Sequence, residues 1–236
     1  MKTGRSYEPE ILDLGPSHYS QEEYDDCMVQ LARIGKLLGG DKASLQMFYN
    51  LPKVGTILDV GCGGGTFAIE LARKFPHVEI TGIDISPQAI KFANKQLKGK
   101  NLNNVHFEVP SNLESFASHS FDVVTSTLVC HHLNDEQLID FLRQSYRVAK
   151  QAVVINDLHR HWLAYSSFRI IAQIFFPNRL IYHDGLLSIK RAFKKHEWIK
   201  YLNAAGIPLE QCSISWHWAF RWVVCIDTSK SSMQKQ

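Results

Sequence analysis

The sequence predicts an α/β fold, in which a mostly parallel sheet carries helices on both faces. A short apolar run at 56–60 enters a glycine-rich loop and then an amphipathic helix near 66–75, the order of a buried strand, a tight turn and a covering helix. A second apolar run at 78–83 ends in Asp84 and is again followed by helix-start signals. Further apolar runs alternate with helical patterns downstream, as a parallel sheet requires, because each crossover between parallel strands needs a long connection.

Length and composition indicate an ordinary globular protein. The chain has 236 residues, of which 45% are hydrophobic and 21% charged, and its net charge of +3 is too small to indicate nucleic acid binding. No signal peptide is visible, and no apolar run approaches the ~20 residues of a membrane span. Five scattered cysteines without C-x-x-C spacing favour reduced thiols in a cytoplasmic protein over a disulfide scaffold or a zinc site. The oligomeric state is left open.

Residues 1–50 are predicted to form an N-terminal helical cap. Ser20 and Glu23 fit a capping box at the start of a helix that ends near Gly39-Gly40, and a second helix is expected from Lys42 to Leu51. We expect 51–228 to form the main domain, with a lid insert at about 159–193, and 229–236 to form a polar tail.

The loop from Asp59 to Gly65 is predicted to hold a nucleotide-like ligand with an anionic end. Glycines let the backbone bend sharply and approach a ligand, and the following helix directs its unpaired N–H groups and its positive dipole end at the loop. A phosphate-binding P-loop would end in Gly-Lys-Ser/Thr, and no lysine stands here. A dinucleotide fingerprint would need a third glycine where Thr66 stands.

Asp84 ends the second strand at a distance from this loop that suits one crossover helix. A carboxylate at the tip of that strand can accept two hydrogen bonds from a ribose diol. Ser86 and Pro87 then begin a helix, as cap and first helical residue. A helix-capping carboxylate is the alternative interpretation of Asp84 taken alone.

Together, the Asp59-x-Gly61-x-Gly63-x-Gly65 string and the Gly-Ile-Asp-Ile-Ser-Pro string at 82–87 resemble the first two motifs of the class I S-adenosylmethionine-dependent methyltransferases. The resemblance covers about 51–228 and implies a Rossmann-like, seven-stranded, mostly parallel sheet with an antiparallel C-terminal hairpin strand, and S-adenosyl-L-methionine as the cofactor. It places Asp59 at the cofactor's ammonium, the loop amides at its carboxylate and Asp84 at its ribose. The implied cofactor-binding residues are Asp59, Gly61, Cys62, Gly63, Gly65, Asp84, Ile85, Ser111, Asn112 and Thr127.

The third and fourth strands are expected at Val105–Val109 and Ser120–Ser126. After the third strand the family's usual acidic dipeptide is replaced by Pro-Ser-Asn, so a contact with the adenine amino group would fall to Ser111 or Asn112. The fourth strand runs out toward His131 and His132. Because ligands bind where the strand order reverses, we expect both histidines near the sulfonium. Alternatively, one histidine caps the next helix, expected over 135–148, and the other packs against adenine.

The exit of the fifth strand, which is expected at Ala152–Asn156, concentrates polar side chains. An apolar helix follows near 168–176, and no helix is assigned to the polar stretch at 182–185. The predicted lid is therefore apolar, which suits an apolar or aromatic small molecule with one nucleophilic oxygen. Its polar rim comprises His159, His161, Tyr165, His183 and Asp184. These groups could bind a metal or hold the lid closed, but nothing in the sequence fixes their mutual geometry, so no metal is expected.

A last helix at Lys195–Ala205, ended by Gly206, precedes two strands near 212–217 and 221–227 that should pair antiparallel. Methyl transfer to a phenol would need a base, and a histidine is the natural choice. His159 is the first candidate, followed by His132 and His183. A carboxylate acceptor would need no base.

Other function classes stay open. A cofactor-binding protein without turnover would keep the same loop and Asp84. A methyltransferase acting on carbon, RNA or protein is a further alternative, although the chain lacks interleaved aromatic and basic residues and has no Asn/Asp-Pro-Pro-Tyr string after the fourth strand. An NAD-linked oxidoreductase is disfavoured by Thr66. The partner expected is a small-molecule substrate, with no nucleic acid and no integral membrane association.

Overall fold

A computed structural model describes residues 4–110 and 112–229. Ser111, expected to contact the cofactor, and all but one residue of the predicted tail lie outside these ranges. Within the described residues, no helix combines the length and the apolar character that crossing a membrane requires.

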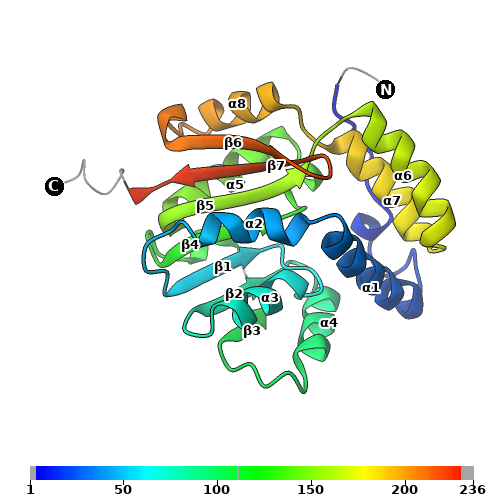
Figure 1. Ribbon diagram of the computed structural model, residues 1–236, viewed down its shortest axis with the longest axis horizontal. Coiled ribbons are helices and arrows are strands. Elements are labelled where there is room, and N and C mark those ends of the chain that lie inside the picture. The colour runs from blue at the N-terminus through cyan, green and yellow to red at the C-terminus, as the bar shows by residue number, and fades with distance from the viewer. Residues whose placement is uncertain (1–3, 111, 230–236) are drawn as a thin grey trace.

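Seven strands form one sheet in the order β3-β2-β1-β4-β5-β7-β6, and β7 runs antiparallel to both of its neighbours (Figure 1). This arrangement confirms the predicted sheet and its C-terminal hairpin. The strands are β1 (Thr56–Val60), β2 (Glu79–Ile83), β3 (Val105–Glu108), β4 (Phe121–Thr127), β5 (Ala149–Leu158), β6 (Cys212–His217) and β7 (Arg221–Asp227).

Helices cover both faces of the sheet (Figure 1). They are α1 (Gln21–Leu37), α2 (Gly40–Phe48), α3 (Thr66–Lys74), α4 (Pro87–Leu97), α5 (Asp135–Val148), α6 (Trp162–Phe175), α7 (Arg179–Arg191) and α8 (Lys195–Ala204), with short 3-10 turns η1 (Leu12–Leu14), η2 (Leu113–Ser115), η3 (Cys130–His132) and η4 (Leu209–Gln211). One hydrophobic core lies between the sheet and α5 and α8, and a second lies between the opposite face and α2, α3 and α4.

The local start and stop signals act as predicted. Ser20 and Glu23 form the capping box of α1, and Ser86 accepts a hydrogen bond from the backbone of Ala89 at the start of α4. Gly206 follows α8 with a φ of 76°, the left-handed region that favours glycine. The predicted boundaries of α2 and β5 are displaced: α2 begins at Gly40, and β5 extends on both sides of the expected run.

The lid differs from the prediction, because it contains two helices and not one. The polar stretch at 182–185 lies inside α7, which packs against α6. Gly185 permits this close approach, since a Cβ there would lie 2.5 Å from Cζ of Phe168 on α6. A glycine among polar residues is typical of a loop in sequence, yet here it is a helix contact point.

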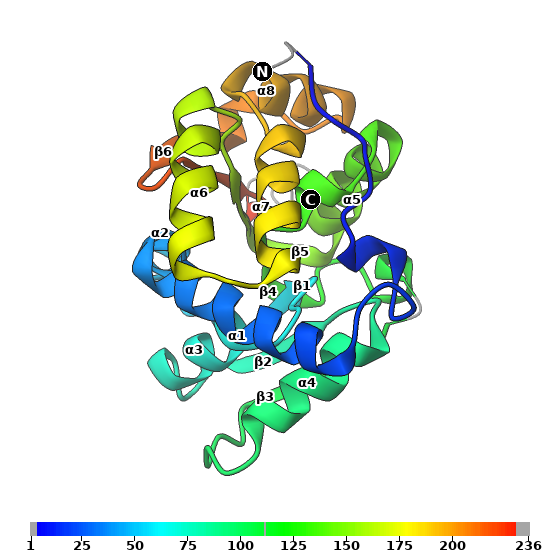
Figure 2. The same ribbon diagram turned by 90° about the vertical axis from the view of Figure 1, so that its right-hand side faces the viewer.

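The strand order reverses between β1 and β4. In this register Asp59 of β1 stands beside Gly82 of β2 and Thr125 of β4. The N-terminal segment 4–19 crosses the molecule alongside α5 and α7 before α1 begins (Figure 2), and the Ser6 backbone N–H donates to the Lys190 carbonyl at 3.1 Å. The carboxyl ends of β1, β4 and β5 are therefore covered by chain from the N-terminus and from the lid.

Candidate functional site

The loop between β1 and α3 has a backbone that only glycine suits. Gly61, Gly63 and Gly65 have φ values of 71°, 52° and 73°. A side chain at Gly61 would collide with Val129, and one at Gly65 would lie 2.6 Å from Cζ of Phe107. The loop therefore packs between Val129, which follows β4, and Phe107 of β3, and it faces α1 on its other side.

Asp59 lies beneath this loop and is almost fully buried, with 2% of its surface exposed. Its Oδ2 atom has no hydrogen-bond partner among the described residues. Burial, with the nearby carboxylates of Asp84 and Asp41, raises the pKa of Asp59 to about 7. A buried carboxylate oxygen without a donor fits a ligand that brings an ammonium group, as predicted for this residue.

Asp84 is held firmly at the tip of β2. Its Oδ2 accepts the backbone N–H of Gly63 at 2.9 Å and its Oδ1 accepts that of Ser86, also at 2.9 Å. Each carboxylate oxygen can accept a further bond, so a diol can still be bound. The next side chain, Ile85, is 88% exposed and offers an apolar surface beside this carboxylate. Cys62 is buried, and its backbone N–H donates to the Ile83 carbonyl.

Two further predicted cofactor residues have different surroundings. The Asn112 side chain accepts a hydrogen bond from the Ser115 backbone at 2.8 Å and so caps η2. Thr127, at the end of β4, has a buried hydroxyl without a hydrogen-bond partner in the described chain. The following residue, Leu128, has a φ of 60°. Strained backbone of this kind is frequent at functional sites.

Helix α1 lies directly over the glycine loop. A Cβ at Gly64 would be 3.7 Å from Cβ of Met28 on α1 and 3.1 Å from the ring of Phe92 on α4. Tyr24 of α1 is buried next to Phe92, with ring centroids 6.3 Å apart. Helix α1, part of the N-terminal helical cap expected at 1–50, therefore lies against the seat for the ligand.

A cluster of titratable side chains lies beyond β4, and we call it the β4-end cluster. Two parallel pairs form its base. His131 places Nδ1 2.7 Å from Oδ1 of buried Asp157, and His132 places Nδ1 2.8 Å from Oδ1 of Asp13. Because an ionised carboxylate only accepts, each pair fixes a proton on Nδ1 and sets the orientation of the ring.

Glu10 of the N-terminal segment completes the β4-end cluster. Its carboxylate lies 3.7 Å from Nε2 of His131 and 3.9 Å from Nε2 of His132. The Ser188 hydroxyl of α7 donates to the same carboxylate at 2.8 Å. Burial raises the pKa of Glu10 to about 7. Glu10 and Asp13 had no signal in the sequence, since both stand in an irregular segment far from the histidines along the chain.

Arg191 of α7 links the lid to the β4-end cluster through hydrogen bonds. Its guanidinium donates to the carbonyls of His131, His132 and Glu8 and to the carboxylate of Asp13, at 2.6–2.9 Å. The N-terminal segment, the β4–α5 connection and α7 are thus joined through one buried side chain.

The other two histidines proposed as bases lie elsewhere. His159, at the end of β5, accepts a hydrogen bond from the Trp216 indole at 3.2 Å, and burial, followed by the nearby charges of His161, Lys194 and Arg160, lowers its pKa to about 4. His183 contacts Asp184 at 2.8 Å. The structure therefore brings His132 into the cluster with His131 but gives His159 and His183 separate partners.

Asp184 itself is buried and anchors the N-terminal segment. Its carboxylate accepts the backbone N–H groups of Ile11 and Leu12 at 2.9 and 3.1 Å. The residue expected on the polar rim of the lid thus holds the lid to the start of η1.

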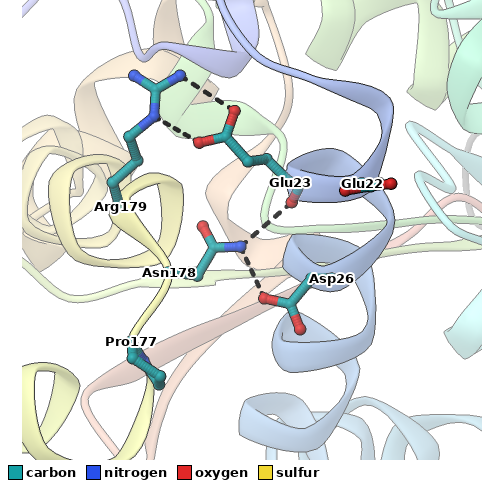
Figure 3. Close-up of a pocket in the computed structure, with 6 residues that line it drawn as sticks. All are labelled: Glu22, Glu23, Asp26, Pro177, Asn178 and Arg179. Atoms are coloured by element: carbon teal, nitrogen blue, oxygen red, sulfur yellow. Dashed lines mark hydrogen bonds and ion pairs between the residues drawn. The ribbon is translucent and has the colours of Figure 1, made fainter.

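A surface hollow marks the contact between α1 and the α6–α7 turn (Figure 3). Asn178 donates to the Asp26 carboxylate and to the Glu23 carbonyl, while Arg179 pairs with the Glu23 carboxylate at 2.7 Å. Asn178, Arg179, Glu23 and Asp26 are engaged with one another, so we interpret the hollow as part of the contact between α1 and the lid.

Comparison with known proteins points to one family. Residues 57–152 match the family model described as "Methyltransferase domain". The chain is 37% identical over 111 residues to a demethylmenaquinone methyltransferase of Porphyromonas gingivalis, covering 44% of each. It is 30% identical over 160 residues to a ubiquinone biosynthesis O-methyltransferase of Azoarcus, covering 66% of each. A ribosomal RNA small subunit methyltransferase G of Macrococcus caseolyticus is 38% identical over 93 residues, covering 38% of this chain and 39% of that protein.

The fold has close counterparts among solved structures. An S-adenosylmethionine-dependent methyltransferase from Aquifex aeolicus superposes with a TM-score of 0.64 at 16% identity, covering 89% of this chain and 99% of that one. A magnesium protoporphyrin IX methyltransferase from Synechocystis with bound S-adenosylhomocysteine gives a TM-score of 0.56 at 19% identity, covering 83% and 84%. By contrast, the aligned region spans only 39–66% of the length of the three sequence relatives.

Proposed function

We propose that this chain, which belongs to the class I S-adenosylmethionine-dependent methyltransferases, transfers a methyl group to a small apolar or aromatic acceptor, at an oxygen atom. The observation that carries the proposal is the Oδ2 atom of buried Asp59, which lies beneath the glycine loop without a hydrogen-bond partner among the described residues. The nearby carboxylate of Asp84 adds to the negative charge at this place. A carboxylate, a glycine loop at a helix N-terminus and a second carboxylate match the ammonium, carboxylate and diol of this cofactor. When bound, S-adenosylmethionine supplies an electrophilic methyl group on a sulfonium.

The residues of the chain would act by binding and orienting. Asp59 would bind the ammonium group of the cofactor, and the backbone amides of Gly61–Gly65 would bind its carboxylate. Asp84 would bind the ribose, and Ile85 would pack against the adenine ring. Thr127 at the end of β4 would face the sulfonium region, and Asn112 or Ser111 the adenine. Alignment of this kind supplies several kcal/mol of barrier reduction without any change in the acceptor.

The acceptor would lie beyond β4 and β5, under the lid. The apolar character of α6 supports an apolar or aromatic acceptor, since Trp162, Ile170 and Ile174 keep 61–66% of their surfaces exposed. The proton of an acceptor hydroxyl would pass to a group at that edge, for which His159, His132 and His183 are the candidates. The geometry favours His132, which is 30% exposed, is oriented by Asp13 and stands next to the reversal of strand order.

A second candidate function is methylation of a macromolecule or of carbon. The match to a ribosomal RNA methyltransferase favours keeping it, although that match is confined to 38% of this chain. Binding of the cofactor without turnover is a third possibility that the same loop residues allow.

The cofactor assignment is tested by calorimetric titration with S-adenosylhomocysteine, with NAD as the comparison ligand and Asp84→Ala as the matched variant. We expect micromolar binding of S-adenosylhomocysteine that Asp84→Ala weakens by at least about tenfold, because the diol loses its acceptor. Preference for NAD, or equal binding by the variant, would contradict the assignment.

The acceptor side is tested by turnover with phenolic and quinol acceptors. His132→Ala is expected to cut turnover by at least about tenfold while the affinity for S-adenosylhomocysteine stays within twofold. His159→Ala in parallel decides between the two histidines. If only His159→Ala loses activity, His159 and not His132 is the general base.

A further inference from the structure

We infer that Glu10, His131 and His132 form a binding site for one divalent transition-metal ion such as Zn²⁺, Co²⁺ or Fe²⁺. Each residue offers one ligand atom, and these atoms lie within 4.8 Å of one another. Two imidazole nitrogens with one carboxylate oxygen are a known donor set for these ions, whereas Mg²⁺ and Ca²⁺ prefer oxygen ligands alone. The inference rests on the proposed function only for what the ion would do there.

The orientation of the two histidines supports a metal more strongly than their proximity does. In both rings Nδ1 is held by a carboxylate, Asp157 for His131 and Asp13 for His132, at 2.7 and 2.8 Å. Both Nε2 atoms then point at the same Glu10 carboxylate. A ligating histidine almost always donates its other ring N–H to a carboxylate or carbonyl in this way, which fixes the tautomer and the ring orientation.

The three ligand atoms stand farther apart than they would around a bound ion. The Nε2–oxygen distances of 3.7 and 3.9 Å are too long for a hydrogen bond. Donors that each stand ~2.0–2.2 Å from a tetrahedral ion are about 3.3–3.5 Å apart, whereas these ligand atoms lie up to 4.8 Å apart, so the side chains would draw together by up to about 1.3–1.5 Å when the ion binds. Glu10 and His131 are buried, and His132 at 30% exposure provides a way in from solvent.

Charge also favours a cation. The carboxylates of Glu10, Asp13 and Asp157 surround the two imidazoles, and Arg191 donates to the Asp13 carboxylate. Buried carboxylates are costly unless they are paired or bind a metal. A divalent ion at this place would favour the ionised forms of these carboxylates.

Three protein ligands leave a position for an exchangeable oxygen, as in catalytic zinc sites. In the proposed reaction that position would take the acceptor hydroxyl, whose pKa the ion would lower. His132 would then act through the ion and not as a free base.

The test uses the full-length protein, freed of metal by a chelator and titrated with Co²⁺ while the visible d–d absorption is recorded. We expect one Co²⁺ per chain, displaced by Zn²⁺ and not by Mg²⁺. Glu10→Gln keeps an acceptor for Ser188 and His132→Gln alters a partly exposed ring, so both should fold while binding at least about tenfold more weakly. Asp13→Asn, which removes no ligand, should also weaken binding by about tenfold.

His183→Gln is the matched control, because His183 also has a carboxylate on Nδ1 but stands outside the cluster. Its Co²⁺ affinity should stay within twofold of wild type. Absence of a one-to-one Co²⁺ complex, or equal binding by Glu10→Gln and His132→Gln in folded protein, overturns the inference. Titration of the same samples with S-adenosylhomocysteine keeps the two proposals separate, since either ligand can bind when the other does not.

Discussion

At the scale of single residues, Asp59 is the group whose chemistry the ligand should change most. In the free protein, burial and two neighbouring carboxylates raise its pKa to about 7, so near neutrality it is partly protonated. An ammonium beside Oδ2 stabilises the charged form and lowers the pKa. Binding of the cofactor and ionisation of Asp59 are therefore linked.

We predict that binding of S-adenosylhomocysteine releases a proton near pH 6.5 and strengthens as the pH rises from 6 to 8. The sign follows because the free protein holds more protons than the complex throughout this range. Calorimetry in buffers of different ionisation enthalpy at one pH measures the proton count. In Asp59→Asn the release should vanish and the affinity should fall and become independent of pH. Proton uptake on binding would contradict the role given to Asp59.

The residues of the site divide by how far apart they stand in the sequence. Asp59, the loop glycines and Asp84 belong to one strand–loop–helix–strand unit, so their neighbourhood follows from local pattern alone. The β4-end cluster could not be predicted, because Asp13 and His132 are 119 positions apart. That pairing depends on the path of an irregular segment that carries no periodicity.

At the scale of elements, the sheet and its covering helices were predictable because their apolar residues recur at strand or helix spacing, and α1 and α4 also begin at the expected caps, Ser20 and Ser86. The hairpin of α6 and α7 was not, since Gly185 and its polar neighbours suggest a loop. The deciding fact is tertiary: the Phe168 ring occupies the space that a side chain at Gly185 would fill.

We predict that Gly185→Ala destabilises the protein by up to about 2 kcal/mol. Alanine favours a helix by ~1 kcal/mol over glycine, but overpacking against Phe168 costs about 1–3 kcal/mol. Gly35→Ala on α1 is the control, because its Cβ would meet nothing closer than 3.6 Å, and it should stabilise slightly. Urea unfolding of both variants gives the two free energies. Equal effects at the two sites would show that the close helix contact does not matter, and Phe168→Leu should partly rescue Gly185→Ala.

At the scale of the whole molecule, the N-terminal part of the chain covers the proposed cofactor site. Helix α1 lies on the glycine loop, and Asn178 links α1 to the α6–α7 turn. Asp184 holds the start of η1. A ligand that approaches the loop from this side would meet α1. The N-terminal segment, α1 and the lid should therefore open as a unit when ligand enters.

We predict that S-adenosylhomocysteine slows amide hydrogen exchange in α1 and in residues 11–14, and leaves α8 and β6 unchanged. Ligand that binds only the closed form stabilises it by about 2.7 kcal/mol at a concentration one hundred times Kd, so amides that exchange through opening of α1 should slow by about one hundredfold. Asn178→Ala, which removes the link between α1 and the lid, should raise exchange in α1 of the free protein and leave α8 as it was. Protection confined to the glycine loop would mean that α1 is a fixed wall, and that the ligand enters from the side of β4.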